Sequence, residues 1–157
     1  MNLTQNFTIQ EVTFSSTADR LGITNVLPAA LWDAVLKTAV GMEKVRALLG
    51  NKPISVDSWY RCLELNRALN SKDTSQHLKG EAVDFISPAY GTCTQIAKFI
   101  LANQDLIRYD QLILEHSWIH ISWNSSNPNS GQRGQVLSLL STGGYSTGLT
   151  DSSGVAV

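Results

Sequence analysis

The chain has 157 residues, of which 43% are hydrophobic and 16% are charged, and its net charge is −1 at pH 7. This length predicts one domain that can bury a core of its own. The balance of 12 basic against 13 acidic side chains argues against a partner such as nucleic acid or anionic lipid, and no apolar run approaches membrane-spanning length.

The first third of the chain predicts an extended segment followed by two helices. Alternation over residues 7–12 predicts a short extended stretch. The polar run 15–17 can cap a short helix that ends at Gly22. Apolar side chains recur at helical spacing over residues 28–49, which predicts a long helix with its apolar stripe in the core.

The rest of the chain predicts strands separated by helices. Alternation predicts strands at residues 53–58, 81–86, 109–115, 118–123 and 136–140. Helical spacing predicts helices at residues 62–69 and 93–102. The third and fourth strands are read as a hairpin or as one continuous segment, and the sequence leaves that choice open.

The end of the chain differs from the rest in composition. From Ser141 onward Ser, Gly and Thr dominate, and Asp151 is the only charged residue. We therefore expect a folded domain over residues 1–140 and a flexible tail over residues 141–157.

A histidine and an aspartate lie seven positions apart between Ser75 and Asp84. His77 follows a polar loop, and Gly80 allows the backbone to turn before the strand that carries Asp84. A loop histidine and a strand aspartate can therefore converge on one ion. His120, in an alternating segment further on, adds an imidazole, and two imidazoles with one carboxylate suit Zn²⁺ and leave a fourth position for water.

These residues carry a resemblance to a known family. The pattern Ser-x-His-x-x-Gly-x-Ala-x-Asp over residues 75–84, followed by Trp-x-His over residues 118–120, resembles the zinc D-Ala-D-Ala carboxypeptidases and L-alanyl-D-glutamate endopeptidases of peptidase family M15. The similarity includes Ser-Trp-Tyr-Arg at residues 58–61 and extends from about Phe7 to about Leu140. The resemblance implies an α+β fold of the Hedgehog/DD-peptidase type, with a small antiparallel sheet flanked by helices.

The resemblance also selects the third metal ligand. His116 and His120 are four residues apart, which is a zinc spacing on a helix but spans about 13 Å in a strand. Both therefore cannot reach one ion unless the chain bends. The family has its ligand two residues after the tryptophan, which is His120. His116 is then a rim residue, and substrate contact and an exposed loop position both stay open for it.

A zinc peptidase of this kind also needs a carboxylate that moves protons. Many family members carry an acidic residue three positions before the last histidine, where this chain has Ser117. Glu115 is the nearest carboxylate, and related phage members and the Hedgehog branch also have a glutamate slightly upstream, so Glu115 is the predicted general base. Glu81 is expected to point away from the face of Asp84, and Asp110 is expected to start a strand.

Three further residues are predicted to contact the substrate. The family has an arginine just after the corresponding strand, so the resemblance implies that Arg61 clamps a substrate carboxylate, whereas the residues alone favour a surface arginine. Trp59 occupies the position of a common glycine, two residues before Arg61. Ser75 either bonds the substrate or a ligand or forms a turn, and Trp118 either walls the cleft or packs in the core.

The sequence thus predicts a zinc-dependent peptidase that cleaves the peptide stems of bacterial peptidoglycan and that could serve as a phage endolysin. The alternative is a catalytically inactive, zinc-containing binding or virion structural module, which Ser117 keeps open. The expected partner is the peptidoglycan stem peptide, with no nucleic acid and no membrane insertion, and the protein is expected to be a monomer.

Targeting and cysteine patterns complete the predictions. The first six residues have neither a basic region nor an apolar core, so we predict no signal peptide. We expect synthesis in the cytoplasm and access to the cell wall through a pore protein or in a virion. Cys62 and Cys93 form no Cys-x-x-Cys motif, so reduced thiols are expected, and a disulfide stays open.

Overall fold

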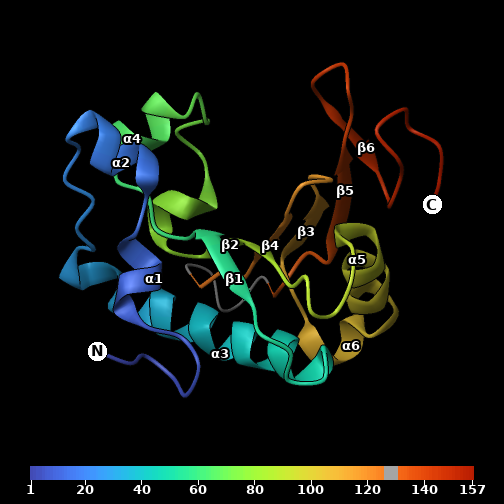
Figure 1. Ribbon diagram of the computed structural model, residues 1–157, viewed down its shortest axis with the longest axis horizontal. Coiled ribbons are helices and arrows are strands. Elements are labelled where there is room, and N and C mark those ends of the chain that lie inside the picture. The colour runs from blue at the N-terminus through green and yellow to red at the C-terminus, as the bar shows by residue number, and fades with distance from the viewer. Residues whose placement is uncertain (126–130) are drawn as a thin grey trace.

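The fold is an α+β arrangement around one six-stranded sheet, seen here in a computed structural model that describes residues 1–125 and 131–157 (Figure 1). The strands lie in the order β1-β2-β4-β3-β5-β6. Their bounds are β1 Ser55–Ser58, β2 Ala82–Ile86, β3 Gln111–Leu114, β4 Ile119–Ser122, β5 Gln135–Leu139 and β6 Tyr145–Thr147. Neighbouring strands are antiparallel except β3 and β5, which are parallel, so the predicted fold class is confirmed and β3–β4 is a hairpin.

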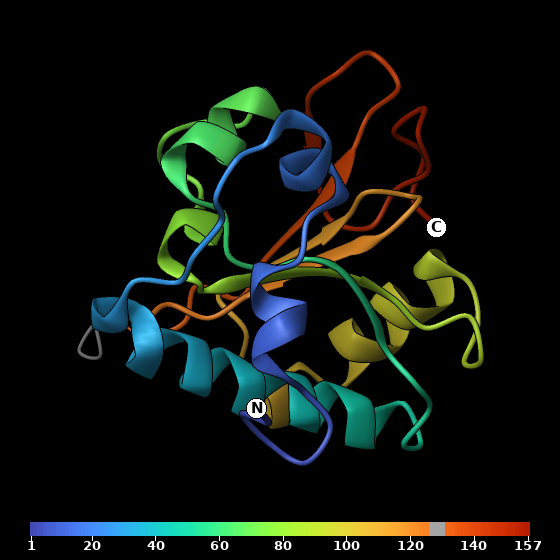
Figure 2. The same ribbon diagram turned by 60° about the vertical axis from the view of Figure 1, so that its left-hand side comes forward.

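Helices cover the two faces of the sheet unequally. Figures 1 and 2 show α3, α5 and α6 on one side, with α2 and α4 standing on the other side. The helices are α1 Ile9–Thr13, α2 Ser16–Leu21, α3 Trp32–Leu48, α4 Leu63–Ala68, α5 Cys93–Ala102 and α6 Gln104–Ile107, with short 3₁₀ turns η1 Ala29–Leu31 and η2 Gln76–Lys79. No helix among the described residues is long and apolar enough to span a bilayer.

The long helix α3 provides the largest part of the core, as its spacing predicted. Its fully buried apolar side chains, three or four residues apart, are Val35, Ala39, Met42 and Val45. They share a core cluster with the residues that β2, β3 and β4 direct to the same side, namely Val83, Phe85, Leu112, Leu114, Ile119 and Ile121. Because strand side chains alternate, the intervening residues of these strands lie on the opposite face, away from the core.

The prediction of an extended stretch at residues 7–12 was wrong. Helix α1 occupies this region, and Thr8 caps it with Oγ1 accepting from the Glu11 backbone N–H at 3.4 Å. The Glu11 carboxylate accepts in return from the Thr8 backbone N–H at 2.7 Å. This reciprocal capping box stabilises a helix over a stretch too short for apolar alternation to decide. The next helix, α2, has the predicted cap at Ser15 and the predicted end at Gly22.

The structure also differs from the expected flexible tail over residues 141–157. Strand β6 pairs with β5, and the turn between them contains Gly143 and Gly144, both with positive φ. Leu149 is 8% exposed and belongs to the core cluster. The Gly- and Ser-rich composition that resembled a tail is the composition of tight turns, which glycine permits by its freedom to adopt positive φ.

Cys62 and Cys93 are free thiols, as expected. Cys62 is the N-cap residue of α4, and its Sγ accepts from the Leu65 backbone N–H at 3.5 Å. The thiol therefore has a local structural role at the start of this helix.

The ordered C-terminal segment gives a first test. We expect Leu149→Ala to lower the free energy of unfolding by about 2–3 kcal/mol, because it removes buried apolar contacts and leaves a cavity. Chemical denaturation would measure this change. Val155→Ala, at a residue that is 63% exposed, is the control and should change stability by less than about 0.5 kcal/mol. Equal, small effects of both changes would mean that residues 141–157 do not contribute to the folded domain.

Candidate metal centre

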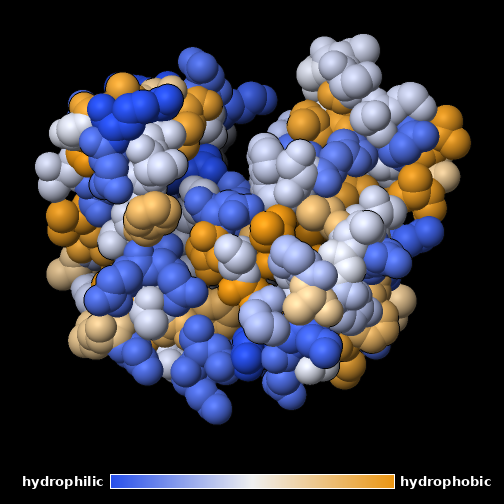
Figure 3. Space-filling view, viewed as in Figure 1, coloured by the Kyte–Doolittle hydropathy of each residue, from blue (hydrophilic) through white to orange (hydrophobic). Residues whose placement is uncertain are grey.

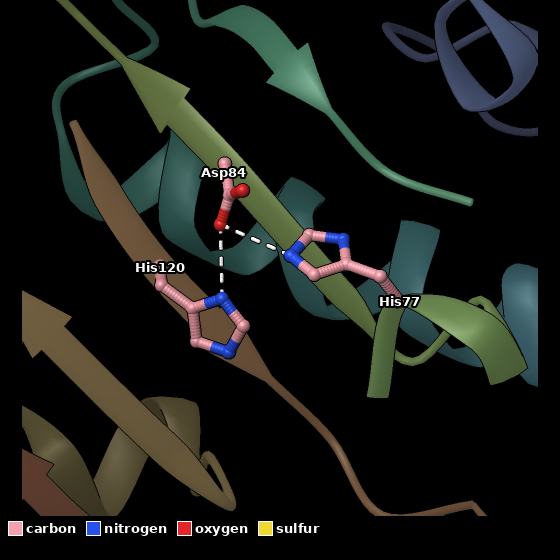
Figure 4. A group of neighbouring side chains, drawn as sticks. All are labelled: His77, Asp84 and His120. Carbon is pink, nitrogen blue, oxygen red and sulfur yellow. Dashed lines mark hydrogen bonds and ion pairs between the residues drawn. The ribbon is translucent and has the colours of Figure 1, made fainter. Parts of the chain in front are cut away.

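The sheet register brings together the residues that the sequence singled out. Asp84 in β2 is the Cα partner of His120 in β4, which is in turn the partner of Ile113 in β3. All three lie on the face opposite α3. His77 in η2 approaches from above this face, so the side chains of His77, Asp84 and His120 point toward one another (Figure 4).

Asp84 is the centre of this group. Its Oδ1 lies 3.2 Å from His77 Nε2 and 2.9 Å from His120 Nδ1. One ligand atom from each of the three residues lies within 4.8 Å of the other two. His77 is 2% exposed, Asp84 6% and His120 9%, so the group is buried at the base of an opening and is not a surface cluster.

The position of His77 depends on contacts made by Trp59 and Gly80. The Trp59 carbonyl lies 2.6 Å from His77 Nδ1, and the Trp59 indole N–H donates to the Gly80 carbonyl at 3.0 Å. Gly80 has φ +68°, and a Cβ there would approach Val35 Cγ2 to 2.5 Å, so only glycine fits. Trp59 and Gly80 therefore hold η2 against the sheet and α3.

The hydrogen bond to Trp59 also sets the chemistry of the His77 ring. A carbonyl can only accept, so Nδ1 carries the proton and Nε2 of the neutral ring directs its lone pair toward Asp84 Oδ1. Two acceptors at 3.2 Å repel unless a cation or a proton lies between them. Burial, the largest influence, lowers the pKa of His77 and disfavours the proton, although Asp84 opposes this effect. The donor set therefore fits a metal cation, which binds neutral imidazole.

Burial alone would raise the pKa of Asp84, but the two histidines outweigh it and hold this pKa far below the usual range. The carboxylate is therefore ionised and supplies the one negative charge of the ligand set. The Nε2 atom of His120 is buried and has no hydrogen-bond partner among the described residues.

Arg61 contacts Asp84 directly. Its Nη2 donates to Asp84 Oδ2 at 2.6 Å, and its Nε donates to Ser58 Oγ at 2.8 Å. The side chain is 12% exposed. Arg61 therefore orients the metal-facing carboxylate by holding the oxygen that the two histidines leave free. The predicted clamp on a substrate carboxylate remains a prediction.

A cleft of about 960 Å³ opens above the three ligands. Figure 3 shows it as a notch with hydrophilic residues at its base, between the lobe that contains α2 and α4 and the lobe that contains β5 and β6. Alternate side chains along β3 face the cleft floor: Gln111 and Ile113 line it, and so does Glu115, the residue after the strand. The open side gives a peptide access to the candidate metal ligands.

The predicted base, Glu115, lies in this cleft. Burial first, and then the charge of Asp84, raises the pKa of its carboxyl group. The Tyr145 hydroxyl donates to Glu115 Oε1 at 3.2 Å. Nothing in the sequence signalled Tyr145, because its contact with Glu115 arises only when β6 pairs with β5.

The other residues that the sequence analysis considered lie partly in the cleft and partly outside it. Ser75 and Trp118 both line the cleft, and Ser75 Oγ also accepts from the His77 backbone N–H at 3.3 Å. His116 is a turn residue with φ +63°, and its Nε2 donates to the Leu139 carbonyl at 2.8 Å. His116 is therefore a half-buried loop residue, and its contact with substrate stays a prediction. The Glu81 carboxylate accepts hydrogen bonds from Ser125 and does not line the cleft, which agrees with the alternation that directs it away from the face of Asp84.

Comparison with known families agrees with this geometry. The family model described as Peptidase M15 matches residues 5–122, which is most of the chain and includes all three ligands. The chain belongs to the peptidase M15 family. Comparison with curated proteins found no match. Membership of a peptidase M15 family implies a metallopeptidase, and His77, Asp84 and His120 are its candidate metal site. Strands β5 and β6 lie beyond the matched residues.

The ligand assignment can be tested by metal binding alone. We expect the purified M15 domain to bind one Zn²⁺ per chain, and His120→Ala to lower its affinity by more than about 100-fold, because a ligand is lost. Competition with a chromophoric chelator would measure this affinity. His116→Ala is the matched control and should bind zinc as the parent does. Unchanged affinity in His120→Ala would remove His120 from the site.

Proposed function

We propose that this protein is a zinc-dependent peptidase that cleaves the peptide stems of bacterial peptidoglycan. One observation supports the proposal most: two buried imidazoles and one carboxylate converge on a single point at the floor of an open cleft, in a chain of the peptidase M15 family. Three protein ligands leave a coordination position for water, which distinguishes catalytic from structural zinc sites.

The residues divide the chemistry between them. Zinc, when bound, lowers the pKa of its water and polarises the scissile carbonyl. His77, Asp84 and His120 would hold it, and Arg61 keeps Asp84 in one orientation. Glu115 accepts the proton of the attacking water and returns it to the leaving amine. Its raised pKa suits it to both steps, because a proton acceptor that is too acidic could not hold the proton between them.

The proposed substrate is a stem peptide, bound by a single copy of the protein. Ser75 and Trp118 line the cleft and are proposed to contact the peptide beside the metal. The bond cut would be D-Ala-D-Ala or L-Ala-D-Glu. We further propose that the protein reaches the wall from the cytoplasm through a pore protein or in a virion, as an endolysin or virion enzyme would.

A second candidate function is a zinc-containing binding or virion structural module without catalysis. Ser117 favours it, since many family members have an acidic residue at this position. In that case zinc would bind with the same ligands, and peptides would occupy the cleft without being cleaved.

Product release from peptidoglycan separates the two functions. We expect zinc-loaded protein to release a defined peptide fragment from purified sacculi or soluble muropeptides, and chelator-treated protein to release none, because the attacking water would lack the metal. Mass spectrometry of the products would identify the bond. With zinc content verified in the sample, absence of any release would decide for the binding module.

The role of Glu115 gives a separate prediction. Glu115→Gln should retain zinc and lower kcat by about 10²–10⁴-fold, because the amide cannot accept the proton of the attacking water. Steady-state turnover of a soluble muropeptide, with zinc content determined in parallel, would measure it. Glu64→Gln, at an exposed residue in α4, is the control and should be fully active. A near-normal kcat for Glu115→Gln would mean that another group moves the proton.

A further inference from the structure

A second polar cluster lies at one end of the cleft, and its centre is Asp110. The side chain of Asp110 is 1% exposed. It accepts from Arg133 Nη2 at 2.7 Å, from Arg133 Nε at 3.1 Å, from the Arg133 backbone N–H at 3.1 Å and from Gln76 Nε2 at 3.2 Å. The carboxylate therefore joins the start of β3, the segment before β5 and the residue next to the ligand His77.

The Arg133 side chain is fixed by hydrogen bonds to Asp110 but remains exposed to solvent. Its Nε and Nη2 face Asp110, whereas Nη1 has no partner within residues 1–125 and 131–157, and the side chain is 57% exposed. Arg133 lines the same cleft as the metal ligands. A guanidinium fixed along one edge by a buried carboxylate can offer its remaining N–H groups to a second carboxylate, at little further cost in side-chain entropy.

The sheet register places this cluster close to the metal centre. Gln111, next to Asp110, pairs with Ser122 and Gln135, two residues along the strands from the row that contains His120 and Ile113. Two residues of strand correspond to about 7 Å. Asp110 is three residues along the chain from Ile113, and Arg133 precedes Gln135 by two further residues. The cluster therefore lies about 10–13 Å along the strand direction from the metal centre, which corresponds to about three or four residues of an extended peptide. Glu115 and Tyr145 lie in the opposite direction along β3 and β6, so Arg133 and Glu115 line opposite ends of the cleft.

The three basic residues that line the cleft are not equivalent. Arg61 already donates to Asp84 and Ser58 and is 12% exposed. Lys72 is an exposed point charge without the planar fork of arginine. Arg133 alone combines a fixed position with an exposed guanidinium edge.

We propose that Arg133, positioned by Asp110, binds a carboxylate of the peptide substrate at this end of the cleft. The inference rests on the proposed peptidase function and adds a subsite to it. The substrate is then a stem peptide with a free carboxylate within about four residues of the cleaved bond, either the α-carboxylate of a γ-linked D-glutamate or the C-terminal carboxylate. Arg133 lies beyond the residues that match the family, so this subsite is a property of the C-terminal part of this chain.

The test compares Arg133→Gln on matched peptides that differ in one carboxylate. Two amidated versions of a cleavable stem peptide, one with D-isoglutamine in place of D-isoglutamate and one with a C-terminal amide, distinguish the two carboxylates. For the free acid we expect Arg133→Gln to raise KM by about tenfold or more and to change kcat less than twofold, because the lost contact is made equally in ground and transition states. For the version whose amide removes the relevant carboxylate, the parent and the variant should have the same KM.

Arg67 provides the matched control. Its Nε and Nη2 also contact an aspartate, Asp73, at 3.1 and 2.6 Å, and the side chain is 62% exposed, but Arg67 does not line the cleft. Arg67→Gln should leave KM unchanged for all three peptides. Arg133→Lys should restore part of the affinity for the free acid and leave the affinity for the amide that lacks the relevant carboxylate unchanged, whereas repair of a purely structural contact with Asp110 would act on all three peptides alike. An equal rise in KM for all three peptides, or no rise for any, would overturn the subsite.

A binding measurement separates this inference from the proposed function. Calorimetric titration of the free acid and the two amides into zinc-loaded Glu115→Gln, with and without Arg133→Gln, does not require turnover. If the parent cleaves nothing but binding of the free acid still falls about tenfold with Arg133→Gln, the peptidase proposal fails and the carboxylate subsite stands. If Arg133→Gln leaves the affinity for the free acid unchanged, the subsite fails whatever the parent cleaves.

Discussion

The candidate site depends on one buried carboxylate, Asp84. Two imidazoles face one of its oxygens and a guanidinium holds the other, so three side chains of the cleft floor are placed with reference to it. Removing a buried ion from its partners is costly, and Arg61 and His120 would each lose a hydrogen bond as well. The same contacts that stabilise Asp84 hold it as an ionised metal ligand, with the histidine nitrogens directed at the same point.

The sheet makes this arrangement possible because one of its faces is apolar and packs in the core, whereas the other carries the polar side chains of the site. One face packs Val83, Phe85 and their neighbours against α3 and α5, which fixes the strands. The other face presents Asp84 and His120 to the cleft. A shift of register by one residue would exchange the two sets, burying the ligands and exposing the core. Burial of the apolar face therefore specifies the register. The same register fixes the relative positions of Asp84 and His120.

Trp59 and the C-terminal strands show how this chain differs from the common pattern of the family it resembles. Trp59 stands where the resemblance expects a glycine, and its indole N–H donates to the Gly80 carbonyl, a contact that glycine could not make. The contact of its backbone carbonyl with His77 Nδ1 does not depend on the side chain. Strands β5 and β6 lie beyond the family match and supply one wall of the cleft, with Leu137 and Tyr145.

The sequence by itself determined the long core helix, through its helical periodicity, and the motif over residues 75–84 that contains His77 and Asp84. The choice of His120 as third ligand, the class of fold and the family came from the resemblance that this motif and Trp-x-His carry. The sequence could not determine α1, whose stretch is too short for alternation to decide between helix and strand, or the C-terminal hairpin, whose Gly-rich turns have the composition of a flexible tail. Only the tertiary structure placed Tyr145 on Glu115, Arg61 on Asp84 and Arg133 on Asp110. Each of these contacts joins residues more than 20 positions apart, and such pairs are set by strand order and register, which no local pattern encodes.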